Sequence, residues 1–383
     1  MNREYPGRRF QAGSQVADRL EALAVDRAKE VFGAEHANVQ PYSGSTANYS
    51  VYSTVLKPGD TVLSMRLDQG GHLTHGRPVN FLSSVYNFVF YGVCPETEII
   101  DYDEVVRLAA VTKPKLLVAG ASSYPRLIDY ERLKSIAASA DALLMVDMAH
   151  IAGLVVARVI PSPVPQADFV SSSTAKTFCS ARGGLVLCKA EHAEKLDKGV
   201  FPWTISSIHL LIIAAKAFYL KQAGSQKCRI VMERVLRNAK ALVAALTERG
   251  FRIVAGGTDT QMVLADLHPK DITGRQLQEA LEYVGITVNK NMIPFDPAKP
   301  AETSGVRIGL TFVSQRGMEE EQIHMVADII GRVADRVGDE NILNQCRKES
   351  EKLIAEFPLY PEFPKTSVNL VRNDGVRPSV RLQ

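Results

Sequence analysis

The chain has 383 residues, more than one ordinary globular core holds, so we expect two domains. Its 45 basic and 42 acidic residues give a formal net charge of +3, which is too small to predict a nucleic-acid partner. No run of about 18 apolar, uncharged residues occurs, so we expect no membrane span. The first residues lack an apolar signal core, and the five cysteines form neither a CxxC pair nor a metal-ligand cluster. These features predict a cytoplasmic protein with reduced thiols and without a metal site.

Helical and strand patterns alternate over about the first 190 residues, which predicts a mostly parallel α/β sheet with strands buried on both faces. Helices are expected at 16–31, 129–140 and 206–221, and strands at 37–40, 60–64, 115–120, 142–147, 168–171 and 184–188. Later helices (231–249, 277–284, 318–337) and strands (251–254, 261–266) interleave less regularly, as in an α+β domain. We therefore predict a large domain at 1–222, a small domain at 223–360 and a surface tail at 361–383.

A Ser43-Gly44-Ser45 sequence follows an expected strand and opens a helical stretch. Small residues let the backbone approach an anion, and a helix N-terminus offers N–H groups to it, so this sequence could form a phosphate cup. An ordinary serine N-cap is the alternative, and it is the commoner use of such a sequence.

A second motif, Gly70-Gly71-His72, places an imidazole on a tightly turned loop. That ring could stack on a flat cofactor ring or shuttle protons, or it could simply face water.

Asp147 directly follows an apolar strand, at the carboxyl end where parallel α/β sheets bind ligands. Its carboxylate could hold a protonated ring nitrogen, or it could cap a helix. His150, three residues later, could point into the same cleft.

Lys176 lies among small hydroxyl residues just after another strand. A desolvated lysine there could form a Schiff base, although a surface lysine is the alternative. The order of phosphate cup, ring-facing histidine, strand-end aspartate and lysine is the one expected for pyridoxal 5′-phosphate (PLP), which needs an anion site, a carboxylate at its ring nitrogen and a lysine.

The chain resembles the serine hydroxymethyltransferase family, PLP enzymes of the aspartate-aminotransferase fold (fold type I), from about Tyr5 to about Tyr360. The resemblance rests on long motifs: Tyr5-Pro6-Gly7-Arg8-Arg9, 21–32, 37–41, 43–48, 57–60, 70–76, 78–81, 146–154, Lys176-Thr177, Arg182-Gly183-Gly184, 256–259, 287–291 and 304–307.

Carried over residue by residue, the resemblance implies a function for each matching position. Ser43, Gly44 and Ser45 would bind the phosphate, and His72 would stack on the ring. Asp147 would pair with the ring nitrogen, and Lys176 would bind the cofactor covalently. Three further residues would lie near the cofactor: Ser122 and His150 at its 3′ oxygen, and Ser173 beside the lysine. Arg307 would bind the substrate carboxylate.

The chain departs from the family at positions that serve folate and at one that helps hold the cofactor's phosphate from the neighbouring subunit. The tyrosine that stacks on folate aligns with Gln11, an asparagine of the folate pocket with Phe295, and a glycine-rich phosphate loop with 203–208. Ala175 replaces the histidine before the lysine. Measured against the family, the chain is expected to lack the segment before Tyr5, with Arg3 near the place of a proton-moving glutamate.

These features predict a PLP-dependent transferase of glycine, serine or threonine metabolism that makes or breaks the Cα–Cβ bond of a β-hydroxy amino acid. It could act without folate, as a threonine-type transaldolase with an aldehyde acceptor or as an aldolase. Authentic serine hydroxymethyltransferase of one-carbon metabolism, using tetrahydrofolate, and a non-catalytic family member are the alternatives. The resemblance also implies a homodimer.

Overall fold

The computed structural model describes residues 4–359, so Arg3 and the expected tail at 361–383 lie outside the described residues. The chain divides into two compact units, Met1–Glu233 and Arg234–Gln383, and each is described by itself. The division falls within helix α8 (Gln226–Glu248). Among residues 4–359, no helix combines the length and the apolar character that crossing a membrane requires.

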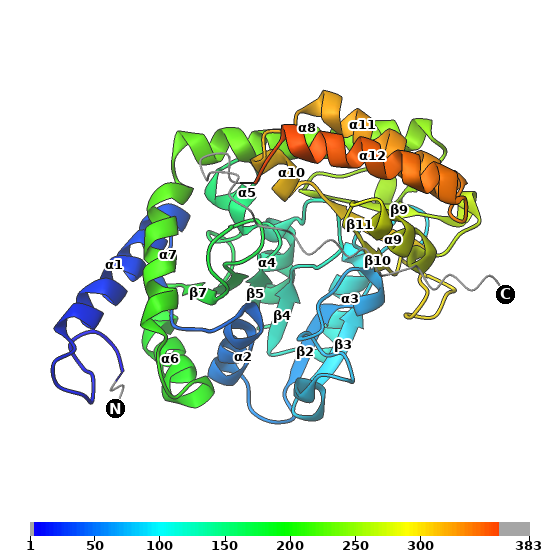
Figure 1. Cartoon of the computed structure of the whole chain (residues 1–383). Coiled ribbons are helices and arrows are strands. Elements are labelled where there is room, and N and C mark those ends of the chain that lie inside the picture. Colours follow the sequence, from blue (N-terminus) through cyan, green and yellow to red (C-terminus); the bar gives the residue numbers. More distant parts are fainter. Residues whose placement is uncertain (1–3, 360–383) are drawn as a thin grey trace. The chain divides into compact units, whose positions relative to one another are not determined.

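The first unit is built on a seven-stranded sheet (Figure 1). Its strands are β1 (His36–Asn38), β2 (Thr61–Met65), β3 (Asn87–Tyr91), β4 (Leu116–Ala119), β5 (Leu143–Asp147), β6 (Phe169–Ser173) and β7 (Gly184–Cys188). Their spatial order is β1-β7-β6-β5-β4-β2-β3, and β7 alone of these seven runs antiparallel to the others. This confirms the predicted α/β class with a mostly parallel sheet.

Successive side chains along each strand belong to opposite faces of this sheet, because the side-chain period of a strand is two. On β5, Leu144 and Val146 join the core on one face, whereas Met145 joins the core on the other. Both faces are therefore covered, as the apolar runs of the strands predicted.

Seven α-helices of this unit cover the two faces. They are α1 (Gln15–Phe32), α2 (Gly44–Val55), α3 (Tyr102–Thr112), α4 (Tyr130–Ser139), α5 (Ala152–Val156), α6 (Ala193–Lys198) and α7 (Leu210–Ala223). Helices α2 and α6 contribute to one core, and α1, α3, α4, α5 and α7 contribute to the other. Short helical turns complete the unit: η1 (Leu67–Gln69), η2 (Phe81–Ser84), η3 (Ala190–His192) and η4 (Gly199–Thr204). Strand β3 and helix α3 were not predicted from the sequence.

The second unit has a four-stranded antiparallel sheet in the order β10-β11-β9-β8. The strands are β8 (Arg252–Ile253), β9 (Met262–Asp266), β10 (Asn289–Asn291) and β11 (Gly305–Gly309). Its helices, besides α8, are α9 (Gly274–Tyr283), α10 (Thr311–Gln315), α11 (Glu320–Asp335) and α12 (Glu340–Glu356). A capping box starts α9, in which the Thr273 side chain and Gln276 satisfy each other's backbone N–H groups.

Candidate active site

The predicted site residues of the first unit follow strands at one edge of the large sheet. Ser43 follows β1, His72 follows β2, Ser122 follows β4, Asp147 ends β5, and Lys176 follows β6. Since the strands that precede these residues run parallel, all five positions lie at the carboxyl edge, where α/β sheets bind ligands.

The predicted phosphate cup is the N-terminus of α2. Ser43 is its N-cap, and its Oγ accepts a hydrogen bond from the backbone N–H of Thr46 at 3.1 Å. An α-helix leaves its first N–H groups without intrahelical partners, so those of Gly44 and Ser45 are available to an anion. Gly44 also approaches Ser173 closely, since a Cβ built on it would lie 3.2 Å from the Ser173 Cβ. The cup therefore lies beside the end of β6, the strand that leads to Lys176.

Asp147 is buried and accepts hydrogen bonds at both carboxylate oxygens. Asn48 Nδ2 donates to Oδ2 at 2.9 Å, and the backbone N–H of Ala149 donates to Oδ1 at 3.0 Å. Burial by itself raises the pKa of this carboxyl group, but the hydrogen bond of His75 and the charge of Lys176, together with the charges that His75 and His72 carry when protonated, outweigh it. The pKa of Asp147 is therefore held well below its usual range, and the group is an anion at neutral pH.

His75 braces Asp147 and was not assigned a function from the sequence. Its Nε2 lies 3.3 Å from Asp147 Oδ2, and its Nδ1 lies 2.6 Å from the hydroxyl of Tyr52. Burial raises the pKa of Tyr52 well above its ordinary value, so this phenol is protonated and donates to Nδ1. The proton of a neutral His75 ring then lies on Nε2, facing the carboxylate. The signal for this residue was the second histidine of the Gly70–Gly76 motif.

His72 is oriented by the loop that carries it. The backbone N–H of Thr74 donates to its Nδ1 at 3.3 Å, and the Thr74 hydroxyl lies 2.7 Å from the same atom. Burial lowers the pKa of His72 to about 4, against the opposing charge of Asp147, so the ring is neutral at physiological pH. A neutral imidazole held at Nδ1 suits stacking on a flat ring better than pairing with an anion.

Lys176 lies in the turn after β6 and is half-buried. Its carbonyl accepts from the backbone N–H of Cys179 at 2.9 Å, which forms that turn. Its charge lowers the pKa values of both Asp147 and His72, so the three groups share one electrostatic environment. Beside it, the backbone N–H of Ala175 lies 3.4 Å from Ser173 Oγ.

His150 and Ser122 are joined to this edge through backbone contacts. Thr177, next to Lys176, donates its hydroxyl hydrogen to the His150 carbonyl at 2.9 Å. The N–H of Ser122 donates to the Gly70 carbonyl at 2.7 Å, which ties the segment after β4 to the loop that carries His72.

Arg307 belongs to the second unit, on β11. Its Nε donates to Asn289 Oδ1 on the neighbouring strand β10 at 3.1 Å. Burial lowers the pKa of its guanidinium, which still remains charged because arginine titrates far above neutral pH. The same unit carries Phe295, whose side chain is 51% exposed.

The donors and charges of the first unit fit PLP. A helix N-terminus suits a phosphate, a buried carboxylate among neutral donors suits a protonated pyridine nitrogen, and Lys176 suits the aldehyde. Ligand atoms of His72, His75 and Asp147 also lie within 4.8 Å of one another, an arrangement that could hold a metal ion. The absence of a resident metal stays a prediction.

Comparison with known families agrees with this fit. Residues 2–330 match the family described as serine hydroxymethyltransferase, which is well over half of the chain. That family comprises PLP-dependent enzymes of fold type I that act in glycine and serine metabolism, and the seven-stranded, mostly parallel sheet is consistent with it. The predicted family resemblance is thus confirmed, and the chain belongs to the serine hydroxymethyltransferase family.

Proposed function

We propose that the protein is a PLP-dependent enzyme that makes or breaks the Cα–Cβ bond of a β-hydroxy amino acid without tetrahydrofolate. One observation carries the proposal: the Asp147 carboxylate is buried, braced by His75 and Asn48, and lies within the electrostatic influence of Lys176. A buried anion of this kind favours a protonated pyridine ring in front of it. When bound, PLP withdraws electrons from the amino acid Cα, which lets a bond at that carbon break.

Each predicted site residue has a defined task under this proposal. The cofactor's phosphate is held by Ser43, Gly44 and Ser45, through their backbone N–H groups and the two serine hydroxyls. Asp147 keeps the proton on the ring nitrogen, and His72 stacks on the ring as a neutral imidazole. Ser122 and His150 bind the 3′ oxygen, Ser173 supports the lysine, Lys176 holds the aldehyde carbon covalently, and Arg307 binds the substrate carboxylate.

The folate-independent form of the reaction rests on residues that replace the family's folate contacts. Gln11 stands where the family has a stacking tyrosine, and its neighbour Phe10 is 74% exposed. Phe295 replaces an asparagine. The amide of Gln11 has no aromatic face for stacking on a pterin ring, and the phenyl ring of Phe295 has none of the hydrogen-bonding groups of an asparagine. An aldehyde is therefore the proposed co-substrate.

The test is glycine formation from serine, threonine and phenylserine, measured with and without tetrahydrofolate. We expect turnover of threonine or phenylserine that does not depend on folate and that Lys176→Ala abolishes. Lys189→Ala is the matched control, because Lys189 lies in the same unit and pairs with Asp168 rather than with the site.

The same assay separates the alternatives. Glycine formed from serine only when tetrahydrofolate is present would show the authentic hydroxymethyltransferase reaction. No turnover of any of these amino acids would favour a non-catalytic member of the family.

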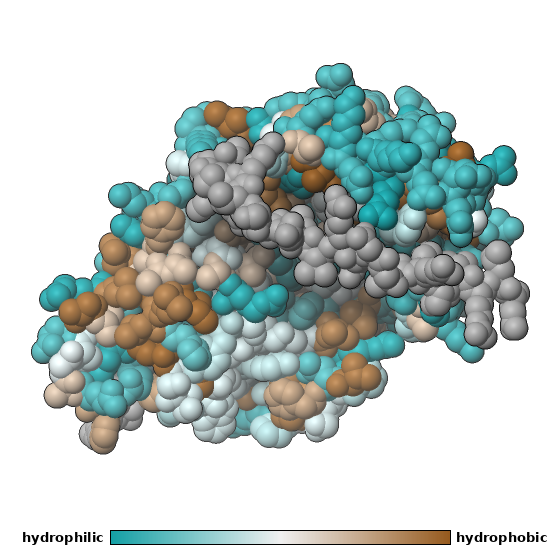
Figure 2. Space-filling model, in the orientation of Figure 1, coloured by the Kyte–Doolittle hydropathy of each residue, from teal (hydrophilic) through white to brown (hydrophobic). Residues whose placement is uncertain are grey.

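We also propose that two copies of the chain associate as a homodimer. Apolar side chains gather on the left of Figure 2, on the side where Figure 1 places α1, α6 and α7. Leu211 and Phe218 of α7 are 84% and 65% exposed. A contiguous apolar surface of this kind is typical of a protein interface. The cytoplasm remains the proposed compartment, in which the five cysteines, which form no disulfide within residues 4–359, stay reduced.

A further inference from the structure

Lys216 on α7 has an ammonium group that none of the predicted roles uses. The residue is only 1% exposed. Its Nζ donates three hydrogen bonds to backbone carbonyls, those of Val39 at 2.6 Å, Pro41 at 3.0 Å and Gly184 at 2.7 Å. Burying an ammonium costs free energy unless its N–H groups all have hydrogen-bond acceptors. The three carbonyls supply these acceptors, and the ammonium in turn supplies each of them with a donor.

The three carbonyls belong to the segments that lead into the phosphate cup. Val39 and Pro41 lie between the end of β1 and Ser43, and Gly184 is the first residue of β7. The N–H of Gly184 also donates to the Pro41 carbonyl at 2.9 Å. A Cβ built on Gly184 would lie 2.2 Å from the Ser43 carbonyl oxygen, so these two backbones are in direct contact. The ammonium therefore links segment 39–41 to the start of β7, and these two backbone segments position Ser43.

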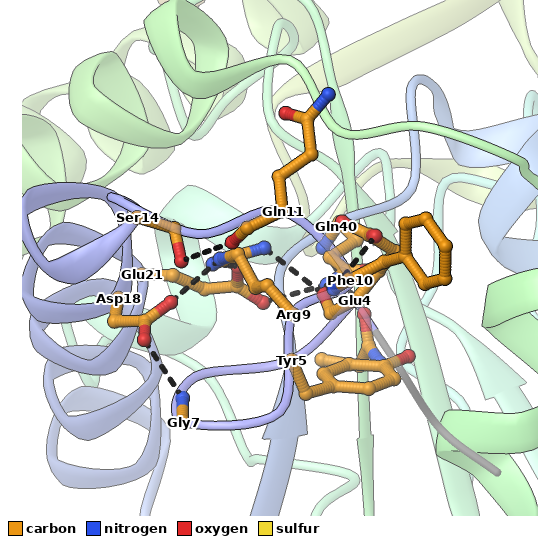
Figure 3. Close-up of polar contacts among 11 residues, drawn as sticks. Glu4, Tyr5, Gly7, Arg9, Phe10, Gln11, Ser14, Asp18, Glu21 and Gln40 are labelled. Carbon is orange, nitrogen blue, oxygen red and sulfur yellow. Dashed lines mark hydrogen bonds and ion pairs between the residues drawn. The ribbon is translucent and has the colours of Figure 1, made fainter.

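The side chain of Gln40 also holds this segment (Figure 3). Its amide nitrogen donates to the Glu4 carbonyl at 2.8 Å and to Glu21 Oε1 at 2.7 Å. Glu21 also accepts from Arg9 Nη2 at 2.5 Å, and the side chains of Arg9 and Glu21 are 4% and 1% exposed. Segment 39–41 is thus held by Lys216 of α7 through its backbone carbonyls, and by Glu21 of α1 through the Gln40 side chain.

Burial and charge act in opposite directions on this ammonium group. Burial lowers the pKa of Lys216 to about 7, and the opposing influence of Glu21 favours the charged form. Within residues 4–359, Glu21 is the acidic group that favours the charged form of this lysine, while the segment after β1 and the start of β7 present backbone carbonyls to it.

We propose that Lys216 is a positioning residue for the phosphate cup, so that its ammonium sets the backbone of Pro41 to Ser43 and thereby the affinity for the phosphate group of PLP. The inference rests on the proposed function, because it assumes that Ser43 to Ser45 bind that phosphate. Lys216 does not touch the cofactor under this proposal; it acts through the carbonyls that it holds.

The test compares PLP with pyridoxal, which differs only in lacking the phosphate. Dissociation constants of both are measured by absorbance titration of the full-length protein, for the wild type, Lys216→Met and Lys221→Met. Lys221 is an exposed lysine on the same helix and serves as the control. We expect Lys216→Met to weaken PLP about 10- to 100-fold, the loss typical of a missing charged hydrogen-bond donor, and to change pyridoxal binding by less than about threefold.

A second variant covers the case in which Lys216→Met fails to fold. A Cβ on Gly183 would lie 2.4 Å from Lys216 Cε and 2.9 Å from its Nζ, so Gly183→Ala displaces the ammonium without removing its charge. Gly183→Ala should weaken PLP selectively in the same way, while thermal unfolding of the apoprotein verifies that the variant is folded.

The outcomes separate the two proposals. A wild-type protein that binds PLP and pyridoxal equally would refute the phosphate cup, and with it the proposed function and this inference. A wild type that prefers PLP, together with folded variants that keep this preference or lose affinity for both ligands equally, would overturn the role of Lys216 alone.

Discussion

His75 Nε2 lies 3.3 Å from Oδ2 of Asp147, in a pair whose members are 2% and 8% exposed. Tyr52 completes the arrangement from the other side of the ring, with its hydroxyl 2.6 Å from His75 Nδ1. The phenol fixes which ring nitrogen carries the proton, and the imidazole then presents a donor to the carboxylate. A tyrosine on α2 thereby controls the charge environment of an aspartate on β5.

We predict that His75→Phe weakens PLP binding about tenfold, because Asp147 loses a buried donor whose net contribution to a charged acceptor is about 1.5 kcal/mol. Tyr52→Phe should cause a smaller loss, since it removes only the brace on the imidazole. His75→Asn still carries an N–H donor, so its loss of PLP affinity should lie between those of His75→Phe and Tyr52→Phe. Absorbance titration with PLP measures all three, and equal affinities for wild type and His75→Phe would rule out the bracing role.

The stability of the apoprotein should fall as the pH drops from 6.5 towards 4, in part because of His72. Its folded pKa is lowered from 6.5 to about 4 by burial, so the unfolded chain binds one more proton in this interval. The free energy of unfolding therefore rises with pH here, by about 2 kcal/mol over the interval for this residue.

Urea unfolding of the wild type and His72→Gln at several pH values checks this contribution. The difference between their unfolding free energies should change with pH across the interval. His324→Gln, on an exposed position of α11, is the control and should follow the wild-type curve. Parallel curves for wild type and His72→Gln would contradict the prediction.

Breaking the buried pair of Arg9 and Glu21 should cost about 3 kcal/mol of stability, because removal of one partner leaves a buried charge uncompensated. Arg9→Met and Glu21→Gln each make this change. The exposed pair of Arg229 and Glu233, with side chains 50% and 42% exposed, is the matched control and should change stability by less than about 0.5 kcal/mol. Thermal unfolding measures these losses of stability. Similar losses at the buried and the exposed pair would contradict the prediction that burial makes the first pair more costly to break.

Lys216 should make the protein more stable as the pH rises from 7 to 9. Burial lowers its folded pKa from 10.5 to about 7, so the unfolded chain binds more protons in this range and the free energy of unfolding rises with pH. We expect a gain of about 1 kcal/mol per pH unit relative to Lys216→Met. Lys221→Met should keep the wild-type slope. Identical slopes for wild type and Lys216→Met in urea unfolding would show that the ammonium is not desolvated.

Much of the large sheet could be predicted from local patterns. The apolar runs at 142–147 and 184–188 correspond to β5 and β7, because strands buried on both faces need continuous apolar sequence. Strand β3 was not predicted, since it lies at the sheet edge and most of its side chains are only partly buried. The strand expected at 37–40 ends at Asn38, whose side chain accepts the N–H of Gln40 at 3.0 Å. That side chain replaces the bond that a further sheet residue would have made.

The sequence by itself determined the family, the α/β class and the candidate residues His72, Asp147 and Lys176, because these depend on motif identity and on strand ends that local hydrophobicity reveals. Only the tertiary structure decided which groups act on them. His75 contacts Asp147 across 72 positions, and Lys216 contacts the backbone of Val39 across 177 positions. Such contacts carry no periodic signal in the sequence, since they arise when separate strands and helices pack together and their buried polar groups must find partners.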